Sequence, residues 1–227
     1  MLVIGHRGAP SIEHENTISS FKTALNFNVD GLEFDVQLTK DYQLIVYHDF
    51  HISYNNQTFN ISDLNLLELQ SFHFDYTIPK FEDVLKICPS DKIINIEIKS
   101  TVIKNTKLVS KIIDLVIKYK LQKNVIISSF NPFVLLEIKK QNKQLKIGLL
   151  WTKDISEKWY VTKYSYKILT PYSFHADIKY INKEISLWVH GLGMKLFIYT
   201  VNDKQQLKIS KELDADAIFS DHPKILR

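Results

Sequence analysis

The sequence predicts an α/β protein built as a (β/α)8 TIM barrel, with a β-hairpin excursion after the second strand and a short insertion over the active-site rim. Three observations predict this fold. Strand-like runs rich in Val, Ile and Leu alternate with amphipathic, helix-like runs along the whole chain, which is the order of a parallel sheet with helical crossovers. The 227 residues, 45% of them hydrophobic, are enough for one such barrel with a full core. Polar residues gather where the strand-like runs end. We therefore expect a single domain, residues 1–227.

Nine segments are predicted as strands because β-branched and aromatic residues dominate them and turn or polar residues bound them. They are residues 2–5, 31–38, 43–48, 92–98, 124–129, 145–150, 166–170, 194–200 and 216–219. Seven segments have helical periodicity: 15–27, 79–87, 105–120, 132–141, 154–162, 177–190 and 203–212. The pairs Asn16-Thr17, Asn131-Pro132 and Asn202-Asp203 supply start signals for three of these helices.

The second and third strand-like segments cannot both belong to a parallel barrel. Only residues 39–42 separate 31–38 from 43–48, whereas a parallel crossover needs a dozen or more residues. The pair is therefore predicted to be an antiparallel hairpin, in which the barrel strand ends near Asp35 and the return strand lies outside the ring. This hairpin brings His48 level with Asp35, and eight barrel strands remain.

Residues 49–78 form the one irregular stretch, which is rich in Asn, Phe and Tyr and holds a candidate short helix at 62–70. Because the stretch follows His48 directly, we expect a short insertion that partly roofs the rim where the strands end.

Composition narrows the functional classes. The formal net charge is +4 and the lysines are scattered, with no block of five or more, so a nucleic-acid partner is not expected. No apolar stretch reaches the roughly 18 residues of a membrane span, so stable membrane insertion is not expected. The chain starts in an apolar strand without the features of a signal peptide. The single cysteine, Cys88, excludes an internal disulfide and fits a reducing compartment. We expect a cytoplasmic protein, and the sequence does not fix its oligomeric state.

Three carboxylates at neighbouring strand ends predict a metal site. Glu33 and Asp35 are two residues apart, so in a strand both point to one face. Inside a barrel, two unpaired carboxylates on one face would repel each other unless a cation lay between them. Glu97 and Lys99 repeat this spacing at the end of the next barrel strand. An all-oxygen site of Glu33, Asp35 and Glu97 favours Mg²⁺ or Ca²⁺.

Two cationic side chains share this rim. Of the 29 basic residues only Arg7 and Arg227 are arginine, so the arginine beside His6 is notable in a chain that otherwise uses lysine. The planar guanidinium can contact phosphate through two N–H groups at once. Lys99 could merely pair with the carboxylates, but we favour a phosphate contact because it lies on the same rim.

His6 and His48 each follow an apolar run, where a lone histidine is more often structural. Two histidines on one rim beside carboxylates favour an acid–base pair. The other histidines, at positions 14, 51, 73, 175, 190 and 222, show no metal-ligand spacing and are expected to be surface or structural residues. A cation site, two cationic side chains and two histidines are what metal-assisted phosphoryl transfer needs. No Gly-x-Ser-x-Gly motif supports a serine hydrolase.

These residues resemble the glycerophosphodiester phosphodiesterase family, in its small cytosolic bacterial form. The resemblance rests on His6-Arg7-Gly8, Glu15-Asn16-Thr17 and residues 31–41, 46–49, 95–99, 129–130, 200–203 and 220–223, in order over nearly the whole chain. It implies a metal-dependent enzyme that hydrolyses small glycerophosphodiesters to an alcohol and sn-glycerol 3-phosphate. It also implies an acid–base pair of His6 and His48, metal ligands Glu33, Asp35 and Glu97, phosphate contacts from Arg7 and Lys99, and a pocket wall at Tyr199, where the family often has tryptophan.

Two alternatives stay open at this point. A lysophospholipase D would use the same chemistry but would need an apolar trough, for which the aromatic residues at 50, 59, 72, 74 and 76 are candidates; they could equally form the core of the insertion. A non-catalytic binder of phosphate ligands on the same barrel would have lost a histidine or a carboxylate, and all are present.

Overall fold

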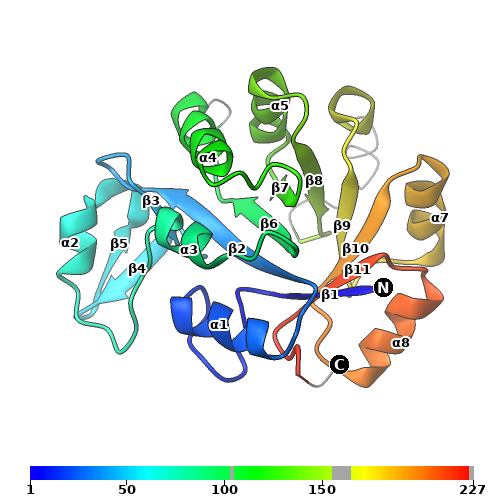
Figure 1. The fold of residues 1–227 in the computed structure, drawn as a ribbon, viewed down its shortest axis with the longest axis horizontal. Helices are drawn as coiled ribbons and strands as arrows, with labels where there is room; N and C mark the ends of the chain where they lie inside the picture. Colours follow the sequence, from blue (N-terminus) through cyan, green and yellow to red (C-terminus); the bar gives the residue numbers. More distant parts are fainter. Residues whose placement is uncertain (103–104, 155–164, 225–227) are drawn as a thin grey trace.

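The computed structural model describes residues 1–102, 105–154 and 165–224. Within these residues, eight parallel strands form a closed ring (Figure 1). In ring order they are β1 (Leu2–Gly5), β2 (Gly31–Leu38), β6 (Ile93–Ile98), β7 (Val125–Ser129), β8 (Lys146–Trp151), β9 (Ser173–Asp177), β10 (Lys195–Tyr199) and β11 (Ala217–Ser220). The ring closes because β1 pairs with β11 on one side and with β2 on the other. The predicted (β/α)8 barrel is confirmed.

Helices surround the ring of strands (Figure 1): α1 (Ile18–Asn26), α3 (Phe81–Ile87), α4 (Thr106–Lys118), α5 (Pro132–Gln141), α7 (Lys183–Gly191) and α8 (Lys204–Glu212). All three predicted helix starts are observed. The side chains of Thr17, Asn131 and Asp203 accept hydrogen bonds from backbone N–H groups in the first turns of α1, α5 and α8. These bonds satisfy donors that a helix start otherwise leaves unpaired. No described helix is long and apolar enough to cross a membrane.

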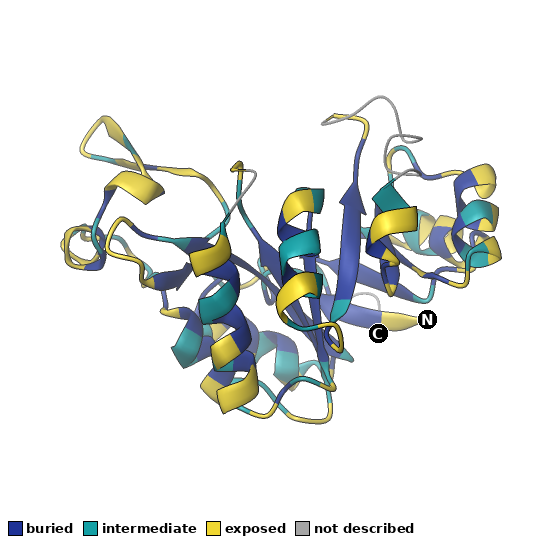
Figure 2. Ribbon diagram, turned by 90° about the horizontal axis from the view of Figure 1, so that it is seen from above, coloured by how far each residue is buried: buried dark blue, intermediate teal, exposed yellow. Residues whose placement is uncertain are grey.

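The strands of the ring are mostly buried, whereas the helices around them have both buried and exposed residues, as Figure 2 shows. Successive side chains of β2 point alternately to the outer and the inner face of the barrel wall. Phe34 points outward, packs edge-on against Phe21 of α1 and joins the main hydrophobic core. A second, smaller apolar cluster includes Phe197 and Phe219, from neighbouring strands. Glu33 and Asp35, between the outward-facing residues of β2, are buried on the other face.

The predicted hairpin is confirmed. Strand β3 (Leu44–Val46) runs antiparallel to the end of β2, with Gln37 opposite Ile45. The backbone N–H of Tyr47 donates to the carbonyl of Asp35 at 3.0 Å. This bond places the next residue, His48, at the level of the carboxylates, as the turn geometry predicts.

The stretch after His48 is more ordered than the sequence predicts. Strands β4 (His51–Tyr54) and β5 (Gln57–Asn60) form a separate antiparallel pair, followed by the 3₁₀ turn η1 (Ile61–Asp63) and α2 (Leu66–Gln70). The two linking residues, Asn55 and Asn56, both have positive φ, the conformation of a two-residue hairpin turn that asparagine tolerates. The Asn-Asn pair was the signal for this hairpin.

The strand predicted at 166–170 is wrong. Residues 165–169 are helical, and the barrel strand is β9, Ser173–Asp177. Tyr166 and Leu169 pack onto the main core at a spacing that suits a helix face. Residues 173–177 lack the β-branched residues that mark a strand. As a result α7 starts at Lys183, later than the helix predicted at 177–190. Apart from Asp154, the helix predicted at 154–162 lies outside the described residues.

Candidate active site

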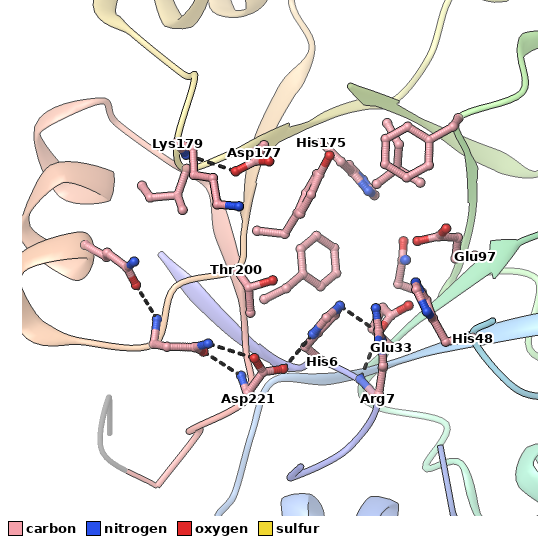
Figure 3. A pocket seen from close by; sticks show the side chains of 18 residues that line it. His6, Arg7, Glu33, His48, Glu97, His175, Asp177, Lys179, Thr200 and Asp221 are labelled. Atoms are coloured by element: carbon pink, nitrogen blue, oxygen red, sulfur yellow. Dashed lines mark hydrogen bonds and ion pairs between the residues drawn. The ribbon is translucent and has the colours of Figure 1, made fainter. Parts of the chain in front are cut away.

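A cavity of about 460 Å³ opens at the carboxyl ends of the barrel strands. Its wall contains six of the eight predicted site residues: Tyr199 and the five labelled in Figure 3, which are His6, Arg7, Glu33, His48 and Glu97. The other two, Asp35 and Lys99, do not line the cavity but form ion pairs with residues that do. The parallel strand ends therefore bring all eight into one region.

The three carboxylates come together as predicted. Strand pairing sets Asp35 opposite Glu97, and each of Glu33, Asp35 and Glu97 offers an oxygen within 4.8 Å of the others. Two of their buried oxygens, Glu33 Oε1 and Asp35 Oδ1, lack a hydrogen-bond partner among the described residues. Buried carboxylate oxygens are costly without a donor or a cation. The cluster therefore fits a hard divalent cation held by oxygen ligands.

The electrostatics of the cluster favour the same interpretation. Burial, followed by the charges of Asp35 and Glu97, raises the pKa of Glu33 well above its usual range. Burial and the charge of Asp35 also raise the pKa of Glu97. Burial alone would raise the pKa of Asp35 too, but the charges of Arg7, His48 and Lys99 hold it below its ordinary value. A bound cation would relieve the repulsion that raises the first two pKa values.

Arg7 is held by carboxylates on three sides. Its backbone N–H donates to Glu33 Oε2 at 2.8 Å, and its Nη1 lies 2.9 Å from both carboxylate oxygens of Glu15. Its Nε lies 3.3 Å from Asp35 Oδ2. Glu15 was not predicted as a site residue, although it belongs to the Glu-Asn-Thr motif. Its neighbour Asn16 donates to Asp35 Oδ2 at 2.9 Å, so this short loop orients both an arginine and a carboxylate.

Lys99 is largely buried and pairs with the carboxylates. Its Nζ lies 3.1 Å from Glu97 Oε1 and 3.9 Å from Asp35 Oδ1. Burial alone would lower the pKa of Lys99, but the charges of Glu97 and Asp35 raise it above its ordinary value. The lysine is therefore a fixed cation beside the cluster.

Each predicted catalytic histidine has an aspartate at Nδ1. His6 Nδ1 lies 2.7 Å from Asp221 Oδ1, and its Nε2 faces Glu33 Oε2 at 3.9 Å (Figure 3). His48 Nδ1 lies 2.7 Å from Asp49 Oδ1 at the cavity mouth. In both rings the Nδ1 contact leaves Nε2 without a competing hydrogen bond in the described residues. Asp221 was not predicted as a site residue; its position after the last barrel strand was the available signal.

Tyr199 lies in the cavity wall, where the resemblance predicts it. Its hydroxyl donates to the carbonyl of Trp151 at 2.8 Å. The aromatic ring, rather than the hydroxyl, is therefore available to contact a molecule in the cavity. Phe130 meets the Tyr199 ring edge-on at 6.3 Å. The two aromatic rings give this wall an apolar surface beside the polar cluster.

The cavity also contains residues that the sequence did not single out. His175, predicted as structural or surface, is fully buried, and Ser173 Oγ lies 2.8 Å from its Nε2. Burial lowers the pKa of His175 to about 3. Asn95 donates to Ser128 Oγ, and its own Oδ1 has no partner among the described residues. Asp177 accepts from Thr152 Oγ1 at 3.0 Å. His175 and Asp177 lie in β9, which the sequence did not predict. Asn95 lies in a predicted strand two residues before Glu97, so the spacing that places both on one face was the signal for it.

Comparison with known proteins gives a consistent result. A model of the glycerophosphoryl diester phosphodiesterase family matches residues 6–225. A glycerophosphodiester phosphodiesterase of Caldanaerobacter subterraneus subsp. tengcongensis is 34% identical over 237 residues, covering 99% of this chain and 96% of that protein. One from Bacillus altitudinis is 30% identical over 238 residues, covering 97% and 94%. The crystal structure of a glycerophosphodiester phosphodiesterase from Thermotoga maritima has a TM-score of 0.81 at 27% identity, covering 99% of this chain and 96% of that one.

Proposed function

Because the chain belongs to the glycerophosphoryl diester phosphodiesterase family, we propose that it hydrolyses small glycerophosphodiesters to an alcohol and sn-glycerol 3-phosphate at the cavity described above. Its enzyme class, glycerophosphodiester phosphodiesterase, follows from that membership. The single cysteine fits a reducing compartment, and we propose a cytoplasmic location.

The observation that carries the proposed chemistry is the buried carboxylate cluster with two unpartnered oxygens. Glu33, Asp35 and Glu97 would hold a divalent cation, Mg²⁺ or Ca²⁺. When bound, such a cation supplies positive charge that neutralises phosphate oxygens and orients the diester. An anionic substrate would otherwise meet three carboxylates of its own sign.

The side chains around the cluster divide the remaining work. Arg7 and Lys99, both fixed by carboxylates, contribute positive charge toward the phosphate. Attack by water forms one P–O bond as the P–O bond to the alcohol breaks, and it gives sn-glycerol 3-phosphate directly. Attack by the glycerol 2-hydroxyl instead expels the alcohol to leave a cyclic phosphate, and water must then attack the phosphorus and break its bond to O2 to give the same product. One of His6 and His48 takes the proton of the attacking oxygen, and the other gives a proton to the leaving alkoxide. Tyr199 forms an apolar wall for the carbon skeleton of the substrate.

The lysophospholipase alternative needs an apolar trough that opens into the cavity. Phe59, Phe72 and Phe74 pack against the separate apolar cluster of the insertion, and Phe72 stacks on Tyr54 at 4.5 Å. None of these four residues lines the cavity at the strand ends. A hollow lined by Phe72, Phe74 and Tyr76 lies within the insertion, and it shares no lining residue with the cavity at the strand ends.

The decisive experiment assays purified protein for glycerol 3-phosphate release from a panel of glycerophosphodiesters, with and without a chelator. We expect turnover that the chelator abolishes and that Mg²⁺ or Ca²⁺ restores. Glu33→Gln and Glu97→Gln should each weaken metal binding in a calorimetric titration while circular dichroism stays unchanged. Full turnover in excess chelator would contradict the metal assignment, and no release from any diester would contradict the function.

A further inference from the structure

The two histidines of the site are supported differently, although both Nδ1 atoms meet an aspartate at 2.7 Å. The His6 side chain is 15% exposed and that of Asp221 29%, against 31% for His48 and 69% for Asp49. Hydrogen bonds to a charged group weaken as water reaches them. The His6 contact is therefore the more persistent of the two.

The carboxylate of Asp221 is itself fixed. Its Oδ2 accepts from Asn202 Nδ2 at 2.7 Å, and its backbone N–H donates to Asn202 Oδ1 at 2.9 Å. The backbone N–H of Asn202 donates in turn to Gln206 Oε1 at 2.7 Å. These bonds form a chain from the first turn of α8 to the ring of His6. Asp49 has only the contact to His48 as a side-chain hydrogen bond among the described residues.

Barrel closure creates this arrangement. The pairing of β1 with β11 sets Gly5 opposite Ser220, and the His6 backbone N–H donates to the carbonyl of Ser220 at 3.0 Å. His6 and Asp221, 215 residues apart in the chain, therefore leave adjacent strands side by side. A carboxylate that accepts from Nδ1–H leaves Nε2 as the lone-pair nitrogen, because a neutral imidazole carries one proton. That nitrogen faces Glu33 and the cavity.

We propose that Asp221 is the positioning residue of the reaction: it holds the proton of neutral His6 on Nδ1 and aims Nε2 at the reacting atoms, whereas Asp49 is dispensable for His48. This inference rests on the proposed function, since it assigns His6 its proton-carrying nitrogen. Asn202 supports it by fixing the Asp221 carboxylate. A ring that loses this support samples the wrong tautomer or flips, and the acid–base contribution of its Nε2 falls.

The test compares Asp221→Asn with its matched control Asp49→Asn, both nearly isosteric changes. On a natural glycerophosphodiester, Asp221→Asn should lower kcat at least about tenfold, since general acid–base catalysis contributes on the order of 10²–10⁴-fold, with KM nearly unchanged. Asp49→Asn should lower kcat less than about threefold, as expected of an exposed pair. In a His6→Ala background, Asp221→Asn should lower kcat no further, because the two residues act as one unit. Equal losses for the two aspartate variants, or independent losses in the double variant, would overturn the inference.

A measurement that does not depend on turnover tests the role of Asp221 separately from the proposed function. In ¹⁵N-edited NMR at alkaline pH, the wild-type ring of His6, identified by its loss in His6→Ala, should carry its proton on Nδ1. Asp221→Asn should shift it toward the Nε2–H tautomer. This result would stand even if no diester of the panel were hydrolysed. A wild-type His6 protonated on Nε2, or a tautomer unchanged in Asp221→Asn, would refute the positioning role whatever the activity.

Discussion

At the scale of single residues, His6 and His48 reach the cavity from different elements, the end of β1 and the segment after β3. A diester with a p-nitrophenyl leaving group needs little protonation when its P–O bond breaks, because that leaving group has a low pKa. We therefore expect His6→Ala and His48→Ala both to be severely impaired on a natural diester, by about 10²-fold or more. On the activated diester only one of them should largely recover, and it identifies the acid.

Steady-state rates of the two variants on both substrates, measured beside the wild type, provide this comparison. If both variants lost little activity on the natural diester, neither histidine would carry a proton, and the site would work through its cations alone.

The buried His175 makes the stability of the folded protein depend on pH. Its pKa of about 3 in the folded protein lies below the ordinary 6.5 because burial disfavours the charged ring. As pH falls from 6.5 toward 3, the unfolded chain takes up this proton first, so the folded protein loses stability by about 1.4 kcal/mol per pH unit in this window. Above pH 6.5 this residue contributes no slope.

Urea unfolding at a series of pH values between 4 and 7 measures this effect. In His175→Gln the free energy of unfolding should fall less steeply as pH decreases. The substitution should also lower stability at neutral pH, because it disturbs the packing on Phe197. His51→Gln, a change at an exposed histidine, should leave the slope as in the wild type. An unchanged slope in His175→Gln would mean that the ring is protonated in the folded protein.

At the scale of elements, Asn131 does more than cap α5. Its Oδ1 accepts from the N–H of Phe133, while its Nδ2 donates to the carbonyls of Ser100 and Val102. Those carbonyls belong to the segment that follows Lys99, so the capping residue also holds the chain after β6 in place by hydrogen bonds. Asp203 at the start of α8 is the simpler comparison, because within the described residues its side chain accepts a single hydrogen bond, from the N–H of Gln206.

We expect Asp203→Ala to cost about 1 kcal/mol in free energy of unfolding, the usual value of a lost cap. Asn131→Ala should cost more, about 2–3 kcal/mol, because two further hydrogen bonds are lost. Equal costs for the two alanine variants in urea titrations would show that the bonds to the 100–102 segment do not stabilise the fold.

At the scale of the whole molecule, the site exists because the barrel closes. The residues that meet at the cavity come from strands along the entire sequence, from His6 after β1 to Asp221 after β11 (Figure 3). The insertion, residues 49–78, is packed separately from the barrel. It has its own strand pair and its own apolar cluster, and it stands to one side of the ring (Figure 1).

The sequence alone predicts the barrel, the hairpin and eight of the residues that gather at the strand ends. Each of these depends on local signals. Strand-like apolar runs alternate with helical ones, and four linking residues permit only an antiparallel return. The i, i+2 spacing of Glu33 and Asp35 puts both carboxylates on one face. The strand at 173–177 lacked such a signal, because Ser, His and Asp are stable there only through burial between neighbouring strands.

The partners of these residues follow from the tertiary structure and not from the sequence. Glu15 pairs with Arg7, and Asp221 with His6. The oxygens left over in the carboxylate cluster are known only when every donor around them is placed. The physical reason is that a hydrogen bond or an ion pair is made or lost when the distance between two side chains changes by a few tenths of an ångström, and these side chains come from segments that only the fold brings together. Local pattern fixes which face of a strand a side chain occupies, whereas closure of the ring fixes what that side chain touches.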